Sequence, residues 1–210
     1  QSLEYIEPTE KLESSSITVD FSVEGNPITH VASGFLHNPK DTTWPPKEIF
    51  AQVKPKHIRG REMYLEEGMK EYLDDYIKVE TKTLLLSSGP ITDDYYPGDN
   101  GNWERYKKFI TKTVTAAQSK GYDFDYEIWN EPNGIGEYWP KSDKEFFETW
   151  KYAYQLIKEL DPNAEIVGPS ATGFEAMCDY DADGDGKIGR YIDEFLAYAK
   201  ANDVIPDILS

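Results

Sequence analysis

Short apolar segments alternate with helical patterns along most of the chain. The pattern predicts strands at 30–37, 56–61, 82–88, 123–131, 164–169 and 206–209, and helices at 46–53, 62–76, 103–119, 143–160 and 190–201. Strands that alternate with helices in this way are typical of a parallel sheet whose connections cross over through helices. The sequence therefore predicts an α/β fold.

The number of predicted strands narrows the fold class. A (β/α)8 barrel of the TIM-barrel type has eight strands and typically about 250 residues, whereas this chain has 210 residues. The predicted strand 206–209 is the last element of the chain, and an unpaired parallel strand would leave backbone groups unsatisfied. We therefore expect an incomplete barrel, with about six of the eight strands. A complete, open six-stranded sheet is the alternative.

The first 29 residues differ from the rest. They are predicted to form a polar leader followed by a half-exposed strand at 17–23, in which apolar and polar residues alternate. Residues 30–210 would then form one partial barrel, a catalytic domain with an acidic loop at 179–189. A chain of this length can build one sizeable core.

Composition limits the partners of the protein. A net charge of −17 argues against binding to nucleic acid or to an anionic membrane surface, but it is compatible with neutral sugars. No apolar run approaches the roughly 18 residues of a membrane span. The chain starts at Gln1 without a methionine. We interpret this start as a processed terminus and expect a secreted or periplasmic protein.

The stretch from Phe124 to Asn133 carries the strongest chemical signal. It begins with the alternation of a strand and ends in Asn-Glu-Pro-Asn, which opens a loop. A carboxyl group, Glu131, is therefore placed at the tip of a strand, beside Trp129 and Pro132. Apolar neighbours disfavour the charged form of a carboxyl group, which suits it to act as a general acid. The alternative is a solvated loop glutamate, as most glutamates are.

This stretch resembles the acid/base signature of the clan A glycoside hydrolases, and more narrowly that of family 39, the β-xylosidases and α-L-iduronidases. The family motif is Trp, any residue, Phe, Glu, any residue, Trp-Asn-Glu-Pro, then Asp or Asn. The chain has Phe124 and Tyr126 at the first and third positions, and Glu127 and residues 129–133 match. The resemblance implies the eightfold β/α barrel, with this strand as its fourth.

The resemblance also implies a mechanism. Retaining glycosidases use one carboxyl group as acid/base and a second as nucleophile. Glu131 would be the acid/base, and Asn130 would bind the sugar hydroxyl next to the reacting carbon. The nucleophile would end strand seven, which this chain does not reach, so we expect the chain alone to be inactive. The missing C-terminal part of the barrel is then an expected partner.

The predicted activity is hydrolysis of β-linked plant or algal polysaccharide or oligosaccharide. Other clan A activities, such as endoglucanase or arabinofuranosidase, share the mechanism. The alternative from a different class is a non-catalytic carbohydrate- or calcium-binding α/β module. A second carboxylate within reach of Glu131 would distinguish the enzyme from the module. No cofactor is expected for catalysis.

Other candidate residues follow the predicted strands, where barrel active sites lie. These strand ends are His37, Arg59 or Arg61, Ser87 and Ser88, Asn130 with Glu131, and Ser170. Of the two arginines we expect one to point into the barrel and one away, with resemblance favouring Arg59 near the site. His37 could contact a sugar.

Three tryptophans could also meet a sugar, because aromatic rings stack on its apolar face. Trp129 and Trp139 are candidate platforms, with a core role equally open for Trp129. Trp44 lies in a proline-rich loop on the same predicted face.

Glu127 is a weaker candidate for the second carboxylate. Four residues of extended strand would place it about 13 Å from Glu131, whereas a retaining pair is about 5 to 5.5 Å apart. A buried carboxylate needs a cationic partner. We therefore expect a structural role for Glu127, paired with Arg59 or Arg61.

The acidic loop resembles half of a calcium-binding EF-hand loop. Asp181, Asp183 and Asp185 occupy positions one, three and five, and Lys187 would offer its backbone carbonyl at position seven. Position twelve is Ile192, where Glu or Asp is expected. Closely spaced carboxylates would repel one another without a cation. The sequence predicts a structural calcium site here, with a solvated acidic turn as the alternative.

Overall fold

A parallel sheet of six strands organises the protein. The computed structural model describes residues 18–20, 22, 23, 25–27, 29, 33–37, 39, 41–61, 65, 67–87, 96–133, 138–172 and 191–210. The strands lie in sequence order, and every neighbouring pair is parallel. They are β1 (Gly34–Leu36), β2 (His57–Gly60), β3 (Thr81–Leu85), β4 (Asp125–Glu127), β5 (Ile166–Gly168) and β6 (Ile208–Leu209). The expected α/β fold and all six expected strands are confirmed.

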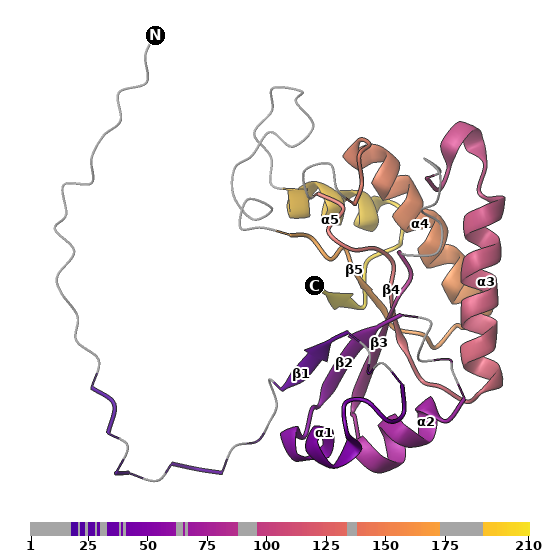
Figure 1. Ribbon diagram of the computed structural model, residues 1–210. Coiled ribbons are helices and arrows are strands. Elements are labelled where there is room, and N and C mark those ends of the chain that lie inside the picture. Colours follow the sequence, from indigo (N-terminus) through magenta and orange to yellow (C-terminus); the bar gives the residue numbers. More distant parts are fainter. Residues whose placement is uncertain are drawn as a thin grey trace, which may run out of the picture.

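The helices connect successive strands. They are α1 (Lys47–Val53), α2 (Met69–Glu71), which continues into the π-helix η2 (Tyr72–Ile77), α3 (Glu104–Ser119), α4 (Asp143–Leu160) and α5 (Tyr191–Ala201), with a 3₁₀ turn, η3, at Asp99–Gly101. In Figure 1 they pass around one side of the curved sheet, from α1 below through α3 to α5 above. The other side carries no helix among the residues that the structure describes. That arrangement is part of a barrel wall.

Two expectations about the elements were wrong. The strand predicted at 17–23 is not formed by the described residues of this segment, which are 18–20, 22 and 23. Val19 and Val23 are 64% and 69% exposed, so the alternating pattern has no surface to pack against. The helix predicted from residue 62 begins, within the described part of the chain, only at Met69. Gly68 precedes it with a φ of 78°, a left-handed conformation that does not continue a helix.

Helix α4 has the bounds that its sequence predicts. Ser142 is its N-cap: the hydroxyl oxygen accepts a hydrogen bond from the Glu145 N–H, and the Glu145 carboxylate accepts one from the Ser142 N–H. This reciprocal capping box satisfies backbone groups that a helix start would leave unpaired. The apolar face of α4 contributes Phe146, Trp150 and Ile157 to the hydrophobic core, and all three are fully buried.

The contact between α4 and β5 requires a glycine. A Cβ atom at Gly168 would lie 2.2 Å from the ring of Trp150, so any side chain there would displace the helix. The Trp150 indole N–H in turn donates to the carbonyl oxygen of Val204, 2.8 Å away. This contact fixes the end of β5, and with it the segment that follows toward Ser170.

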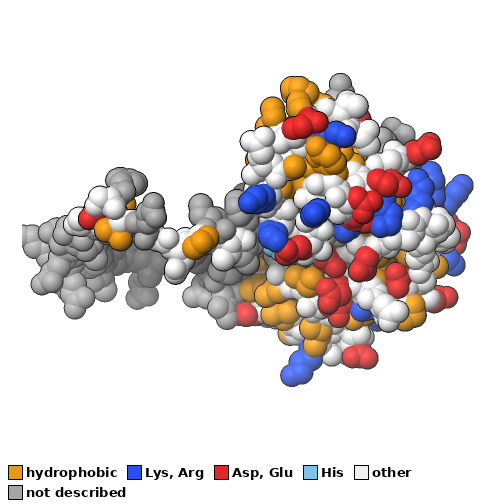
Figure 2. All heavy atoms as spheres, turned by 90° about the horizontal axis from the view of Figure 1, so that it is seen from below, with side chains coloured by type: hydrophobic (Ala, Val, Ile, Leu, Met, Phe, Trp, Pro, Cys, Tyr) orange, Lys and Arg blue, Asp and Glu red, His pale blue; other side chains and the backbone are white. Residues whose placement is uncertain are grey.

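Acidic residues outnumber basic ones by 39 to 22 in the sequence, which gives the net charge of −17. In Figure 2, acidic and basic side chains intermix over the main body of the molecule. No helix in the described ranges combines the length and the hydropathy that crossing a bilayer requires.

Candidate active site

The carboxyl ends of the strands surround a cleft of about 510 Å³. Parallel strands end at the same edge of a sheet, so residues that are distant in sequence meet there. The cleft is lined by His37 after β1, Arg59 and Arg61 from β2 onward, Asn130 and Glu131 after β4, and Ser170 after β5. The strand ends predicted from the sequence are therefore brought together, except that Ser87 is buried and Ser88 lies outside the described residues.

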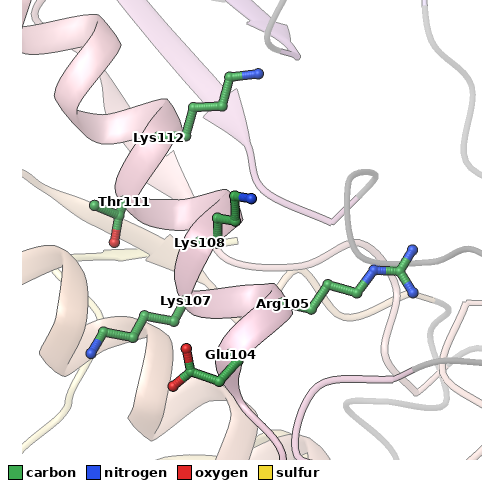
Figure 3. A pocket seen from close by; sticks show the side chains of 6 residues that line it. All are labelled: Glu104, Arg105, Lys107, Lys108, Thr111 and Lys112. Carbon is green, nitrogen blue, oxygen red and sulfur yellow. The ribbon is translucent and has the colours of Figure 1, made fainter.

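Another hollow on the surface is a weaker candidate for a functional site than the cleft at the strand ends. Its volume is about 590 Å³, and it lies on the outer surface of α3 among Arg105, Lys107, Lys108 and Lys112. Figure 3 shows these side chains leaving the helix in different directions rather than converging on one point. Long cationic side chains on an exposed helix are ordinary surface residues, so we assign no site here.

Glu131 is held at the cleft by its backbone. Its N–H donates to the carbonyl oxygen of Ser170, 2.9 Å away. The side-chain amide of Asn133 pairs with the backbone of Thr172 through two hydrogen bonds of 2.8 Å each. Glu131 has a φ of 48°, a left-handed conformation that persists in a non-glycine residue where the surroundings determine it. The loop after β4 is therefore locked to the segment after β5, with the half-buried Glu131 side chain at the cleft.

Glu127 and Arg59 form a partly buried ion pair in the wall of the same cleft. Glu127 is 3% exposed and accepts hydrogen bonds from Arg59 Nε and from the hydroxyl of Ser170. Arg59 Nη2 also donates to Asn130 Oδ1 at 2.8 Å. The expected structural role of Glu127 is confirmed, and of its two expected partners, Arg59 and Arg61, the structure shows Arg59. Because Arg59 contacts both side chains, it links the buried carboxylate to the orientation of the Asn130 amide.

The expected opposite orientation of the two arginines was wrong. Both Arg59 and Arg61 line the cleft. Residues two apart on a strand face the same side, because successive side chains alternate. His37 also lines the cleft as expected, exposed at the end of β1, and its backbone N–H donates to the carbonyl oxygen of Arg59 at 3.0 Å.

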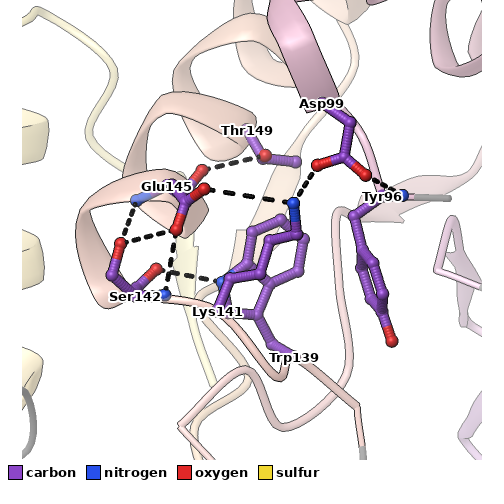
Figure 4. A network of polar contacts seen from close by, with 7 residues as sticks. All are labelled: Tyr96, Asp99, Trp139, Lys141, Ser142, Glu145 and Thr149. Atoms are coloured by element: carbon purple, nitrogen blue, oxygen red, sulfur yellow. Dashed lines mark hydrogen bonds and ion pairs between the residues drawn. The ribbon is translucent and has the colours of Figure 1, made fainter. Parts of the chain in front are cut away.

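Trp129 and Trp139 are packing residues rather than sugar platforms in this structure. They are 1% and 3% exposed, and their rings meet edge to face with centroids 5.2 Å apart. The Trp139 indole N–H donates to the carbonyl oxygen of Ser142 at 3.0 Å, within the polar network that caps α4 (Figure 4). Trp129 donates to the carbonyl oxygen of Tyr138 at 3.3 Å. The core role left open for Trp129 is the one that the structure shows, and it applies to Trp139 as well.

Sequence reasoning missed Tyr138 and Ser210, which also line the cleft. Ser210 Oγ lies 3.0 Å from Ser170 Oγ and so extends the Glu127 network toward β6. Tyr138 is 39% exposed and offers the cleft an accessible aromatic ring. From the sequence, Tyr138 could be assigned only to the loop between β4 and α4. A loop has no periodicity from which the direction of a side chain can be predicted.

The predicted calcium ligands Asp181, Asp183, Asp185 and Lys187 lie outside the described residues. Within the described ranges, no group of three or more His, Cys, Asp or Glu side chains is placed to hold a metal ion. Calcium binding by the acidic loop stays a prediction.

Comparison with solved structures defines the class of the fold. The chain superposes on a glycoside hydrolase family 39 enzyme from Xanthomonas axonopodis pv. citri with a TM-score of 0.58 and 16% identity, covering 84% of this chain and 39% of that one. A family 39 β-xylosidase from Caulobacter crescentus gives a TM-score of 0.56 and 16% identity, covering 84% and 45%. The fold is therefore that of part of a glycoside hydrolase barrel of the TIM type.

Sequence comparison agrees with this class. The chain is 29% identical over 119 residues to a β-xylosidase from Caldicellulosiruptor saccharolyticus, covering 53% of this chain and 24% of that protein. No family model matches the chain. The chain spans about a quarter of the length of the curated relatives it matches, 24% and 27%. Together the comparisons support the resemblance to family 39 glycoside hydrolases.

Proposed function

We propose that this chain supplies the acid/base half of the active site of a retaining glycoside hydrolase acting on β-linked plant or algal polysaccharide or oligosaccharide. The observation that carries the proposal is the position of Glu131: it follows β4, faces the cleft, and stands next to Asn130, whose amide is held by Arg59. The likeness to proteins named β-xylosidases supports a xylose-containing substrate among the β-linked sugars.

In the first step, the Glu131 carboxylic acid would donate its proton to the glycosidic oxygen as the bond from that oxygen to the anomeric carbon breaks. A second carboxylate would form a bond to the same carbon. In the second step, the Glu131 carboxylate would take a proton from water while the water oxygen attacks the anomeric carbon and releases the second carboxylate. Asn130 would bind the adjacent sugar hydroxyl in both steps.

The second carboxylate must come from elsewhere than Glu127. Both of its oxygens accept hydrogen bonds, one from Arg59 and one from Ser170, and its side chain is buried. A nucleophile has to reach the anomeric carbon of a bound sugar. We therefore propose that the nucleophile belongs to further barrel strands beyond these 210 residues, which would act as the partner of this chain.

The test compares this chain with a gene-length protein and its Glu131→Gln variant on nitrophenyl glycosides and β-linked oligosaccharides. The gene-length protein should be active and this chain inactive. Glu131→Gln should lower kcat by about 10²- to 10⁴-fold. The loss should be larger for an oligosaccharide than for a nitrophenyl glycoside, because nitrophenolate leaves with less help from a proton. Glu159→Gln, at an exposed position of α4, is the matched control and should keep full activity.

Two outcomes would contradict the proposal. Activity of this chain alone would place a nucleophile among its own carboxylates. Binding of sugars without cleavage by the gene-length protein would favour the non-catalytic carbohydrate-binding module. Calcium binding at loop 179–189 and a secreted or periplasmic location stay predictions, to be tested by calcium titration and by fractionation of the native host.

A further inference from the structure

Asn133, two residues after Glu131, joins the loop after β4 to the segment after β5. Its side-chain carbonyl oxygen accepts a hydrogen bond from the N–H of Thr172, and its side-chain NH2 group donates to the carbonyl oxygen of the same residue, both at 2.8 Å. The amide therefore pairs with the backbone of Thr172 through both of its polar groups, as a neighbouring strand would. Asn133 is half-buried and does not line the cleft.

This pair, the Asn133–Thr172 clamp, reinforces a backbone contact at Glu131. The N–H of Glu131 donates to the carbonyl oxygen of Ser170 at 2.9 Å. Glu131 and Ser170 both have left-handed backbones, with φ angles of 48° and 59°. A residue other than glycine keeps such a conformation only where its surroundings determine it. The clamp adds two hydrogen bonds between the same two segments to the one that Glu131 makes itself.

The segment after β5 is anchored independently, so it can serve as the fixed side of the clamp. Ser170, two residues before Thr172, is 8% exposed, and its hydroxyl donates to the buried carboxylate of Glu127. The position of Glu131 in the cleft therefore depends on a segment that follows another strand. Asn133 is a side chain that connects the two segments directly.

We propose that Asn133 is a positioning residue for the acid/base Glu131, and that it acts through the backbone of the loop rather than by contact with substrate. The proposal rests on the proposed function, because it takes Glu131 as the proton donor. Proton transfer requires the Glu131 carboxyl group within hydrogen-bond reach of the glycosidic oxygen, and a displacement of about 1 Å can cost about 10²-fold in rate. Loss of the clamp should therefore impair the cleavage of bonds that need a proton and spare those that do not.

The test measures kcat/KM of the gene-length protein, which reports formation of the glycosyl–enzyme bond, for two kinds of substrate. A β-linked oligosaccharide needs a proton on its leaving group, whereas the dinitrophenolate released from a dinitrophenyl glycoside is a weak base and leaves without one. Asn133→Ala should lower kcat/KM about 10- to 100-fold for the oligosaccharide and less than about threefold for the dinitrophenyl glycoside. Asn133→Asp keeps an acceptor for the Thr172 N–H and should recover part of the loss.

Asn202→Ala is the matched control. The Asn202 amide also makes two hydrogen bonds, donating to the carbonyl oxygen of Tyr198 and accepting from Lys151 Nζ, both at 2.9 Å. Asn202 follows α5 and does not line the cleft. Its variant should lose a similar amount of stability in urea unfolding, with kcat/KM unchanged for both substrates. Amide hydrogen exchange at Glu131 should be faster in Asn133→Ala and unchanged in Asn202→Ala, because only the first change loosens that N–H.

Other results would overturn the proposal. If Asn133→Ala lowers kcat/KM equally for both substrates, Asn133 supports the cleft in general and not proton transfer. If Asn133→Ala cleaves the oligosaccharide as fast as Asn202→Ala does, the position of Glu131 does not depend on the clamp. Failure of the proposed function has a different signature. If the wild type cleaves neither substrate, or if Glu131→Gln is as active as the wild type, Glu131 is not the acid/base and both proposals fall.

Discussion

Each of the two sides of the cleft has a tryptophan, and the two tryptophans differ in their exposure to solvent. On the β4 side, Trp129 is 1% exposed and packs against Tyr106 of α3 and against Trp139, with ring centroids 6.3 and 5.2 Å away. On the β1 side, Trp44 is 60% exposed in a loop that follows an edge strand. Trp129 is two residues from Glu131 and Trp44 is far from it in sequence. Access of a ring to a ligand is therefore decided by the elements that pack on it, not by its distance from the motif.

The largest expected effect is on the free energy of unfolding, and it tests the difference in burial between Trp129 and Trp44. Trp129→Ala should lower the free energy of unfolding by about 3–5 kcal/mol, because it removes a fully buried ring and leaves a cavity. Trp44→Ala should change it by about 0.5 kcal/mol or less, as is usual for an exposed residue. Urea unfolding of both variants measures the difference. Similar losses in the two variants would show that the two sides of the cleft are equally packed.

The next effect concerns the polar network on the β4 side. Ser170→Ala removes a donor to Glu127 and leaves one buried carboxylate oxygen without that hydrogen bond. The expected loss in the free energy of unfolding is about 1–3 kcal/mol. Ser119→Ala is the matched control, because Ser119 is exposed at the end of α3 and its hydroxyl donates only locally, to Ala116. A loss no greater than that of the control would mean that Arg59 alone supports Glu127.

The sequence predicted the features that depend on local pattern or on simple rules of burial. Apolar periodicity located all six strands and the full extent of α4, because each segment must bury one face. The partner of Glu127 was predictable to within two residues, because a buried carboxylate requires a cation and Arg59 and Arg61 were the candidates; the structure shows Arg59 of β2.

The features that depend on loops were not predictable in the same way. The directions of Trp129, Trp139 and Tyr138 follow from how the segment after β4 returns to α4, which no short-range pattern encodes. The strand expected at 17–23 had the right alternation, but its described residues have no neighbouring strand to pair with. An amphipathic pattern predicts a strand only where a partner exists.

The smallest expected effect concerns a second carboxylate of β4 and depends on pH. Burial raises the pKa of Asp125 to about 6, the negative charges of Glu165 and Asp123 add to the rise, and Lys82 opposes it. Glu127, two residues later, has Arg59 as an ion-pair partner. Strand β4 therefore carries one carboxylate with a direct cationic partner, Glu127, and one whose charged form is disfavoured, Asp125.

Because the pKa of Asp125 is higher in the folded state than its ordinary value of 3.8, the folded state binds more protons between these values. Stability is then lost as pH rises from about 4 to about 6 and stays lower above that. Asp125→Asn should raise the free energy of unfolding by about 1–2 kcal/mol at pH 8 and leave it unchanged at pH 4. Urea unfolding at both pH values tests this, with the exposed Asp75→Asn as control. An Asp125→Asn effect that is the same at both pH values would assign it to packing rather than to charge.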